Sequence, residues 1–262
     1  MRIGVCFKIV PDYETLLEAE WEQPDGLDFT YVKKMYGCFD EGALETALRM
    51  ADSLKAAAQP VETVAVTCGA PEGSVSDSLL RALFAAGFDD VVLLPANESF
   101  VSRNTAKSLA SYFTSYPADL IFTGRMVGPS DSGTVPAFLA AELGAEFYPE
   151  AVAARWNPED GRAEITCKDN GFLKRYAVSS GAVCSVGDSE AGYLRLFPLK
   201  ARMEAKKRVL SRFEPAETED CEGMAPILRA EKTESACRFL EYKSAEDAAA
   251  QLLGFLKGDA EG

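Results

Sequence analysis

The feature that most constrains the fold is the alternation of two kinds of apolar pattern along the first 145 residues. Short apolar runs at 2–10, 62–68, 91–95 and 118–123 are typical of buried strands. A segment with apolar residues at helical spacing follows each run, after a long connection in the first case. Four strands that alternate with helices predict a parallel sheet with right-handed crossovers and helices on both faces. We therefore expect a doubly wound α/β fold.

The connection at residues 12–36 is longer than most loops between a strand and a helix, so it is either an insertion or a loop that faces a partner. Asp40 is expected to cap the helix that follows it. The apolar residues of that helix form one stripe, which core packing explains most simply: Ala43, Leu44, Ala47, Leu48, Ala51 and Leu54. A second helix follows the turn at 69–73, and a third covers about 99–115.

The stretch from Ala118 to Gly144 predicts a strand, a turn rich in Gly, Ser and Pro, and then a helix. Gly124, Gly128, Pro129 and Gly133 interrupt regular structure and let the backbone approach a ligand closely. Asp131, Ser132 and Thr134 are candidate caps of the helix. The helix carries Val135, Phe138, Leu139 and Leu143 on one face. Because unpaired N–H groups and the positive end of the helix dipole meet at such a turn, it can bind phosphate. An ordinary strand–helix turn is the alternative interpretation.

Cys6, Cys68 and Gly124 lie at or near the carboxyl ends of predicted strands, where ligands bind in sheets of this kind. This convergence favours a nucleotide site. The turn at 69–73 is not the G-x-G-x-x-G sequence, and no G-x-x-x-x-G-K-S/T sequence occurs. Neither the dinucleotide fingerprint nor the P-loop therefore supports the nucleotide hypothesis.

Composition excludes several functions. The chain has 41 acidic and 27 basic residues and a formal charge of −14, which argues against nucleic-acid binding and against attraction to anionic membranes. It has no histidine, so Ser-His-Asp and Cys-His catalysis are excluded. Its seven cysteines form no C-x-x-C pair, which predicts a reducing cytoplasm and disfavours a zinc site. No apolar run approaches the length of a membrane span, and the N-terminus resembles a strand rather than a secretion signal.

Beyond Gly144 the pattern changes. Two alternating runs at 162–167 and 173–178 flank a turn and predict a hairpin, and 182–186 predicts a further strand. We expect these three strands to complete the same sheet as antiparallel members. Residues 214–235 have the composition of an extended arm, and Ser244 is expected to cap a last helix with an apolar stripe of Ala248, Leu252, Leu253 and Leu256.

Four segments resemble the electron-transfer flavoprotein beta subunit family, in order and spacing. Residues 5–12, Val-Cys-Phe-Lys-Ile-Val-Pro-Asp, are similar to the family's opening strand, and residues 39–49, Phe-Asp-Glu-Gly-Ala-Leu-Glu-Thr-Ala-Leu-Arg, to its next helix. Residues 124–135 resemble the family's Gly-Arg-Gln-Ala-Ile-Asp-Gly-Asp-Thr-Gly-Gln-Val turn. Residues 195–207 resemble Arg-Tyr-Pro-Ser-Leu-Lys-Gly-Ile-Met-Lys-Ala-Lys-Lys. The chain departs from the family pattern at Gly37, Cys38, Met126, Pro129, Thr134 and Glu204.

The resemblance implies an electron carrier rather than an enzyme, which pairs with an alpha subunit that holds much of an FAD. It implies a nucleotide-binding domain at 1–190 that takes AMP or a second FAD, and a partner-recognition segment with a C-terminal arm at 191–262. The cofactor-binding residues would be Cys6, Gly37, Cys38, Phe39, Asp40, Cys68, Gly124, Arg125, Met126, Val127, Gly128, Asp131, Ser132, Gly133, Thr134 and Val135. The arm would reach the alpha subunit through its terminal helix.

In the family, a Leu at the position of Leu199 anchors a loop that docks on partner dehydrogenases. The basic segment 192–213 would supply this loop here, with Leu196, Phe197 and Leu199 as exposed anchors and Lys206 and Lys207 at the rim. A solvated helix face is the simpler explanation of the basic residues.

Two rival functions stay open. A stand-alone adenine-nucleotide-binding regulator resembling universal stress proteins would need no alpha subunit. An adenylating enzyme of the ATP-pyrophosphatase type would carry Ser-Gly-Gly-x-Asp-Ser after the first strand, which residues 8–12 do not match.

Overall fold

The structure, a computed structural model, describes residues 1–16, 31–69, 74–95, 102–128, 132–178, 180–215, 239 and 241–257. Clustering of close residues divides the chain into two compact units, Met1–Gly223 and Met224–Gly262. The first unit holds the sheet and six helices, and the second holds one helix, α7 (Ala245–Lys257), among the residues described.

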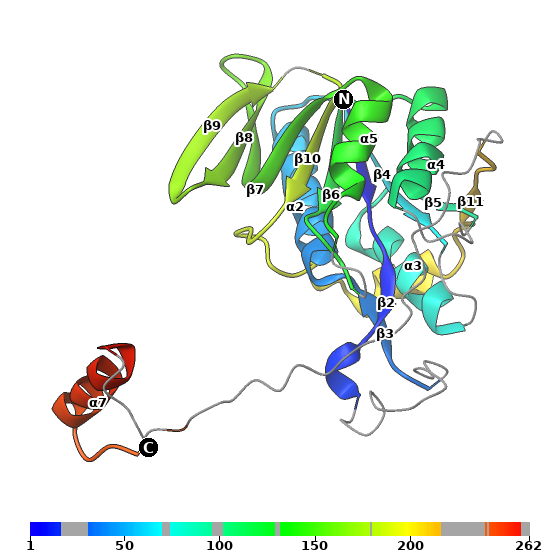
Figure 1. Cartoon of the computed structure of the whole chain (residues 1–262). Coiled ribbons are helices and arrows are strands. Elements are labelled where there is room, and N and C mark those ends of the chain that lie inside the picture. The colour runs from blue at the N-terminus through cyan, green and yellow to red at the C-terminus, as the bar shows by residue number, and fades with distance from the viewer. Residues whose placement is uncertain are drawn as a thin grey trace. The chain divides into compact units, whose positions relative to one another are not determined.

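The first unit is built on a nine-stranded sheet with the order β11-β5-β4-β1-β6-β10-β7-β8-β9 (Figure 1). All neighbours from β11 to β7 run parallel, and β8 and β9 add an antiparallel hairpin at one edge. The expected doubly wound, mostly parallel α/β fold is therefore confirmed. The strands are β1 (Arg2–Cys6), β4 (Glu62–Cys68), β5 (Asp90–Leu94), β6 (Leu120–Gly124), β7 (Glu146–Asn157), β8 (Arg162–Asp169), β9 (Phe172–Val178), β10 (Ala182–Val186) and β11 (Ser211–Arg212).

The first predicted strand, 2–10, is two strands in the structure. After β1 the chain leaves the main sheet, and β2 (Ile9–Pro11) pairs antiparallel with β3 (Lys34–Tyr36). A short 3-10 helix, η1 (Tyr13–Thr15), follows β2. Part of the long connection therefore folds back beside the first strand, and its residues 17–30 lie outside the described part of the chain.

The expectation that the strands after Gly144 are all antiparallel is wrong for β10, which lies between β6 and β7 and runs parallel to both. β7 itself was not predicted. Its sequence includes Pro149, which removes a ladder donor, and it does not alternate cleanly between apolar and polar residues. Both surprises reflect pairing between segments far apart in sequence, which local patterns do not report.

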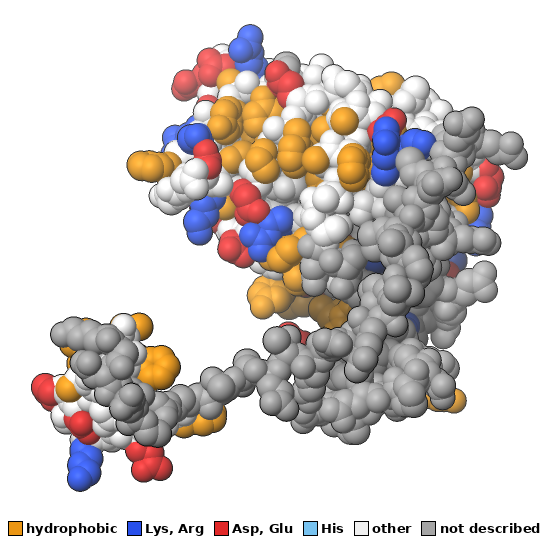
Figure 2. All heavy atoms as spheres, viewed as in Figure 1, with side chains coloured by type: hydrophobic (Ala, Val, Ile, Leu, Met, Phe, Trp, Pro, Cys, Tyr) orange, Lys and Arg blue, Asp and Glu red, His pale blue; other side chains and the backbone are white. Residues whose placement is uncertain are grey.

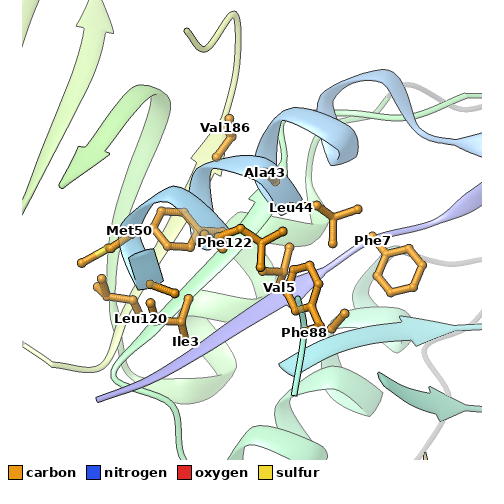
Figure 3. Packing of buried hydrophobic residues seen from close by; sticks show 14 of the residues in the cluster. Ile3, Val5, Phe7, Ala43, Leu44, Met50, Phe88, Leu120, Phe122 and Val186 are labelled. Atoms are coloured by element: carbon orange, nitrogen blue, oxygen red, sulfur yellow. The ribbon is translucent and has the colours of Figure 1, made fainter. Parts of the chain in front are cut away.

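Helices cover both faces of the sheet. One core joins the strands to α2 (Cys38–Ala56) and α3 (Ser74–Ala86), and the other joins them to α4 (Ser102–Ser115) and α5 (Val135–Leu143). In Figure 3 Val5 and Phe122 lie near Ala43 and Leu44 of α2, and Ile3 lies beside Leu120, closer to Met50 of the same helix. All six residues of the predicted α2 stripe are buried, so that assignment is confirmed. In α5 Leu139 is buried, but Phe138 is partly exposed, contrary to the predicted stripe.

The order of the strands reverses beside β1. After β1 the chain adds β4 and β5 on one side, and then returns to place β6 on the other side. The carboxyl ends of β1 and β6 therefore diverge around a crevice, which is where doubly wound sheets bind ligands. Cys6 and Gly124 are the last residues of these two strands.

Candidate functional site

A cavity of about 180 Å³ opens at this switch point. The ends of β1, β4 and β6 form its floor, and the N-terminal turns of α4 and α5 contribute to its wall. Its lining residues are Cys6, Phe7, Lys8, Asp40, Cys68, Gly69, Ser102, Thr105, Leu109, Thr123, Gly124, Arg125, Met126, Val127, Ser132, Gly133, Thr134, Val135 and Pro136. The cavity thus combines apolar walls with a few polar groups, as small-molecule sites do.

Asp40 links the two central strands at the floor. Its carboxylate accepts hydrogen bonds from the backbone N–H of Lys8 at 2.9 Å and of Gly124 at 3.1 Å. Asp40 therefore does not cap α2, as the sequence predicted: the helix begins at Cys38, and Gly37 is its N-cap residue. Burial raises the pKa of Asp40 to about 7, although both hydrogen bonds oppose the shift.

Two glycines make room for this carboxylate. A Cβ atom on Gly124 would overlap the Asp40 carboxylate, and one on Gly37 would lie 2.5 Å from Asp40 Oδ2 and 2.6 Å from a methyl group of Val127. The predicted reason for Gly124 was a close approach of backbone to a ligand. In the structure the close approach is to Asp40, a residue of the same chain.

The amide groups at the mouth of β6 are also occupied, since the N–H of Gly124 is bound to Asp40 and that of Arg125 donates to Val186 O at 2.9 Å. The first turn of α5 offers other amides, which helix geometry leaves without partners inside the helix. Gly133 leads into this turn with φ +61°, and a Cβ there would lie 3.2 Å from Arg125 O.

The polar groups beside α5 form a small hydroxyl cluster. Ser132 Oγ lies 3.2 Å from both Ser102 Oγ and Thr134 Oγ1. Thr134 is the N-cap residue of α5, but its side chain makes no capping hydrogen bond, and Ser132 also gives none to the helix. The capping roles predicted for these two residues are therefore not observed, and Asp131, the third candidate, lies outside the described residues.

The residues present fit an adenylate group. Lys8 brings an ammonium group to the cavity, where its Nζ donates to Gly128 O at 3.4 Å. The hydroxyl of Thr123 is buried in the lining and has no hydrogen-bond partner among the described residues. A cation, an unsatisfied hydroxyl and the N-terminus of α5 are the groups that bind a phosphate, and the apolar wall can bury a base.

Glu150 and Phe39 hold the side chain of Arg125 in place. Its Nη1 lies 3.2 and 3.3 Å from the two carboxylate oxygens of Glu150. Its guanidinium stacks 4.5 Å above the ring of Phe39. Glu150 lies in β7, the strand that the sequence did not predict, so its contact with Arg125 could not be foreseen from the sequence.

Eleven of the sixteen predicted cofactor-binding residues line the cavity: Cys6, Asp40, Cys68, Gly124, Arg125, Met126, Val127, Ser132, Gly133, Thr134 and Val135. Gly37, Phe39 and Gly128 lie behind the lining in contact with Asp40, Arg125 and Lys8 respectively, while Cys38 is exposed. The sequence analysis missed Lys8, Gly69 and Thr123, although their positions at or just beyond strand ends were a usable indication.

The predicted partner-binding segment forms α6 (Leu199–Ala205) and its flanks. Leu196 and Leu199 are 99% and 75% exposed, and Lys206 and Lys207 are exposed too. Phe197 is half-buried against the core, so its expected role as an exposed anchor is wrong.

Arg195 fixes the start of this segment. Its guanidinium and backbone N–H bind the buried carboxylate of Glu45, with the shortest distances at 3.0 Å, and its Nη1 lies 2.7 Å from Asp52. At the other end Arg81 donates to the carbonyl groups of Lys206 and Arg208.

In the second unit, Ser244 Oγ accepts from Asp247 N at 3.2 Å, so the predicted cap of the last helix is confirmed. The leucines Leu252, Leu253 and Leu256 of α7 are all exposed. The predicted arm at 214–235 lies almost entirely outside the described residues. No helix among the described residues is long and apolar enough to cross a membrane. The described residues also contain no cluster of side chains suited to a metal.

The fold defines a doubly wound α/β protein with a cavity at its topological switch point. Residues 37–218 match the family model of the electron transfer flavoprotein domain. The electron transfer flavoprotein subunit beta of Bradyrhizobium diazoefficiens is 26% identical over 211 residues, which cover 80% of each chain. The acryloyl-CoA reductase electron transfer subunit gamma of Anaerotignum propionicum is 29% identical over 149 residues, 55% of this chain and 52% of that protein.

The chain belongs to the electron transfer flavoprotein family, in its beta-subunit branch. The resemblance described from the sequence is therefore confirmed, and with it a role in electron transfer of the flavoprotein type.

Proposed function

We propose that this chain is the beta subunit of a heterodimeric electron carrier and binds an adenine nucleotide in the cavity at the switch point. An alpha subunit would share the electron-carrying FAD, which supplies the redox chemistry when bound. The observation that carries the proposal is the cavity itself, where residues from three strand ends and two helix N-termini meet.

Within the cavity, Lys8 and the first turn of α5 would hold the phosphate. The Thr123 hydroxyl would complete its hydrogen bonds. Leu109 and Val135 would contact the base through their apolar side chains, because these residues belong to the lining on the two helices. AMP and the adenylate half of an FAD share these features. AMP would be structural, whereas an FAD would carry a redox-active flavin on its adenylate group.

Exposed apolar surfaces support pairing with another chain. Phe172 and Leu173 at the start of β9 are 71% and 68% exposed, and Figure 2 shows hydrophobic side chains gathered over the β7–β9 part of the sheet. In the other unit α7 presents its leucines without cover from the described residues. Large exposed apolar patches mark protein interfaces, so we assign the hairpin and α7 to the alpha subunit.

Leu196 and Leu199, with Lys206 and Lys207 beside them, would meet the dehydrogenase partners. Apolar anchors within a basic rim suit a transient complex, because the charges guide the encounter and the leucines hold it. Arg195 supports this role by fixing the segment to α2.

A stand-alone nucleotide-binding regulator is the competing proposal. Such a regulator would use the same cavity. This hypothesis does not explain why the leucines of α7 and of the 195–207 segment are exposed. Several free thiols among the described residues also accord with our proposal of a reducing cytoplasmic location.

The experiment that tests the proposal is co-expression of the full chain with an alpha-type subunit of the same organism, followed by gel filtration and absorbance spectroscopy. We expect a 1:1 complex that carries flavin. A variant in which Leu252, Leu253 and Leu256 are changed to Ser should lose the complex. As the matched control, changing Ala250, Gly254 and Lys257, which lie on the opposite face of α7, to Ser should retain it. A flavin-free monomer from the unaltered chain would contradict the heterodimer and favour the regulator.

A further inference from the structure

We propose that Glu150 determines the ligand specificity of the cavity: by neutralising Arg125, it makes the site prefer an adenine ligand with one phosphate over ligands with longer phosphate chains. The inference rests on the proposed nucleotide site and assigns a part to a residue outside the cavity lining. It concerns the choice of ligand rather than the ability to bind one.

Arg125 is the lining residue that would otherwise reach an extended phosphate chain. Its Nη1 lies within 3.3 Å of both Glu150 oxygens, and its guanidinium lies 4.5 Å above Phe39. Its Nε is buried and has no partner among the described residues. The guanidinium is therefore enclosed between a ring and a carboxylate, and a turn toward phosphate would break both contacts.

The backbone around Glu150 is specialised for this contact. Glu150 has φ +52°, a conformation that non-glycine residues rarely adopt, and it lies beside a register shift between β7 and β10. Gly187 lies against its carboxylate, since a Cβ there would be 2.5 Å from Glu150 Oε2. Strained residues of this kind persist where the surrounding structure enforces them, often at functional sites.

The local charges then decide the ligand. Lys8 and Arg125 are the basic residues in the described lining, while Asp40 is the acidic one and Glu150 lies directly behind Arg125. Burial raises the pKa of Asp40 to about 7, so this carboxyl is only partly ionised near neutral pH. Glu150 offsets the charge of Arg125 and holds its guanidinium, so this second cation of the described lining is not available to a longer phosphate chain. Each further phosphate therefore adds negative charge that Arg125 does not meet.

The test measures the affinities of the full chain for AMP, ADP and ATP by calorimetry, without magnesium, at low and high salt. For the unaltered chain we expect the affinity to fall from AMP to ADP to ATP. In Glu150→Gln, which keeps the size of the side chain and removes its charge, the ratio of ATP affinity to AMP affinity should rise about fivefold, equivalent to about 1 kcal/mol. High salt should reduce that rise, because the effect is electrostatic.

Two further variants make the result specific. Glu62→Gln removes the same charge from an ion pair with Arg2 at the opposite end of the strands, and should leave the ratio unchanged. In an Arg125→Gln background, Glu150→Gln should no longer alter the ratio, because the charge that it uncovers is gone.

Nucleotide binding with the same ratio in Glu150→Gln and the unaltered chain would overturn this inference and leave the proposed function standing. The absence of any nucleotide binding would overturn the proposed function itself. Circular dichroism on each variant establishes that a changed ratio does not come from unfolding.

Discussion

Asp40 connects three elements through one carboxylate: it belongs to α2 and binds the amides at the ends of β1 and β6. The sequence suggested a helix cap, because Asp often takes that position at the start of an apolar stripe. The structure uses the residue one turn later, where its side chain substitutes for an anion between two strand ends. A carboxylate in this position holds the floor of the cavity in place before any ligand arrives.

The raised pKa of Asp40 predicts a dependence of stability on pH. Its pKa is about 7 in the folded chain against 3.8 for an unperturbed group, so folding takes up a proton between these values. The free energy of unfolding should therefore fall as the pH rises from about 4 to about 7 and level off above that range. Urea unfolding across this pH range measures the effect.

Asp40→Asn is the matched variant. It cannot ionise, so the part of the slope that comes from Asp40 should disappear. At pH 5 Asp40 is protonated, and its hydroxyl oxygen can still accept from one of the two amides, whereas the NH2 group of Asn can only donate. The variant should therefore be about 1 to 3 kcal/mol less stable at pH 5. Slopes that are identical in the two proteins would show that Asp40 titrates normally.

The close packing around Gly124 predicts that a substitution there lowers the stability of the fold. In Gly124→Ala, the new Cβ meets the Asp40 carboxylate and the backbone of Phe39 and Asp40, which cannot move away freely. We expect a loss of about 1 to 3 kcal/mol in the free energy of unfolding, as for other overpacked sites.

Gly192→Ala is the control for Gly124→Ala, because no atom lies within 4 Å of the Cβ that it adds. It should change stability by less than about 0.5 kcal/mol. Equal effects of the two substitutions, measured by thermal or urea unfolding, would contradict the account of Gly124 as a residue selected by a contact.

At the scale of elements, the alternation of strands and helices was sufficient to predict the central sheet and the edge of it at which the cavity lies. Cys6, Cys68 and Gly124 could be placed together because parallel strands end at one edge. β7 and the position of β10 could not be predicted, since they depend on pairing between distant segments, and Pro149 obscured the strand. The Glu150–Arg125 contact was hidden for the same reason.

The 195–207 segment gives a prediction for an element. Arg195→Ala leaves the buried carboxylate of Glu45 with the backbone N–H of residue 195 and with Arg49, whose Nε lies 3.2 Å from it. We expect a loss of about 2 to 3 kcal/mol in the free energy of unfolding, somewhat below the usual cost of breaking a buried ion pair because Arg49 remains.

The comparison for Arg195→Ala is Arg155→Ala, which breaks an ion pair with Glu164 in which the arginine is largely exposed. Its cost should stay below about 1 kcal/mol. Denaturant unfolding of both variants decides the matter, and similar costs would mean that the segment is held by its apolar contacts rather than by Arg195.

At the scale of the whole molecule, the described residues combine a cavity at the switch point with exposed apolar side chains. Membership of the electron transfer flavoprotein family is consistent with this combination. The two-subunit electron carrier that we propose needs both a cofactor region and contacts with another chain. The acidic composition argues against nucleic acid but could not point to a partner chain, because the partner contacts that we propose are apolar and local.

The central claim is that the cavity at the switch point holds an adenine nucleotide. The most direct measurement is chromatography and mass spectrometry of the small molecules released when the purified full chain, in complex with its alpha subunit, is denatured. The account predicts about one adenine nucleotide per chain beyond the shared flavin. It also predicts loss of that nucleotide in Lys8→Gln but not in Lys55→Gln, which alters an exposed lysine at the end of α2. Release of no such nucleotide from the unaltered complex, or equal release from both variants, would contradict it.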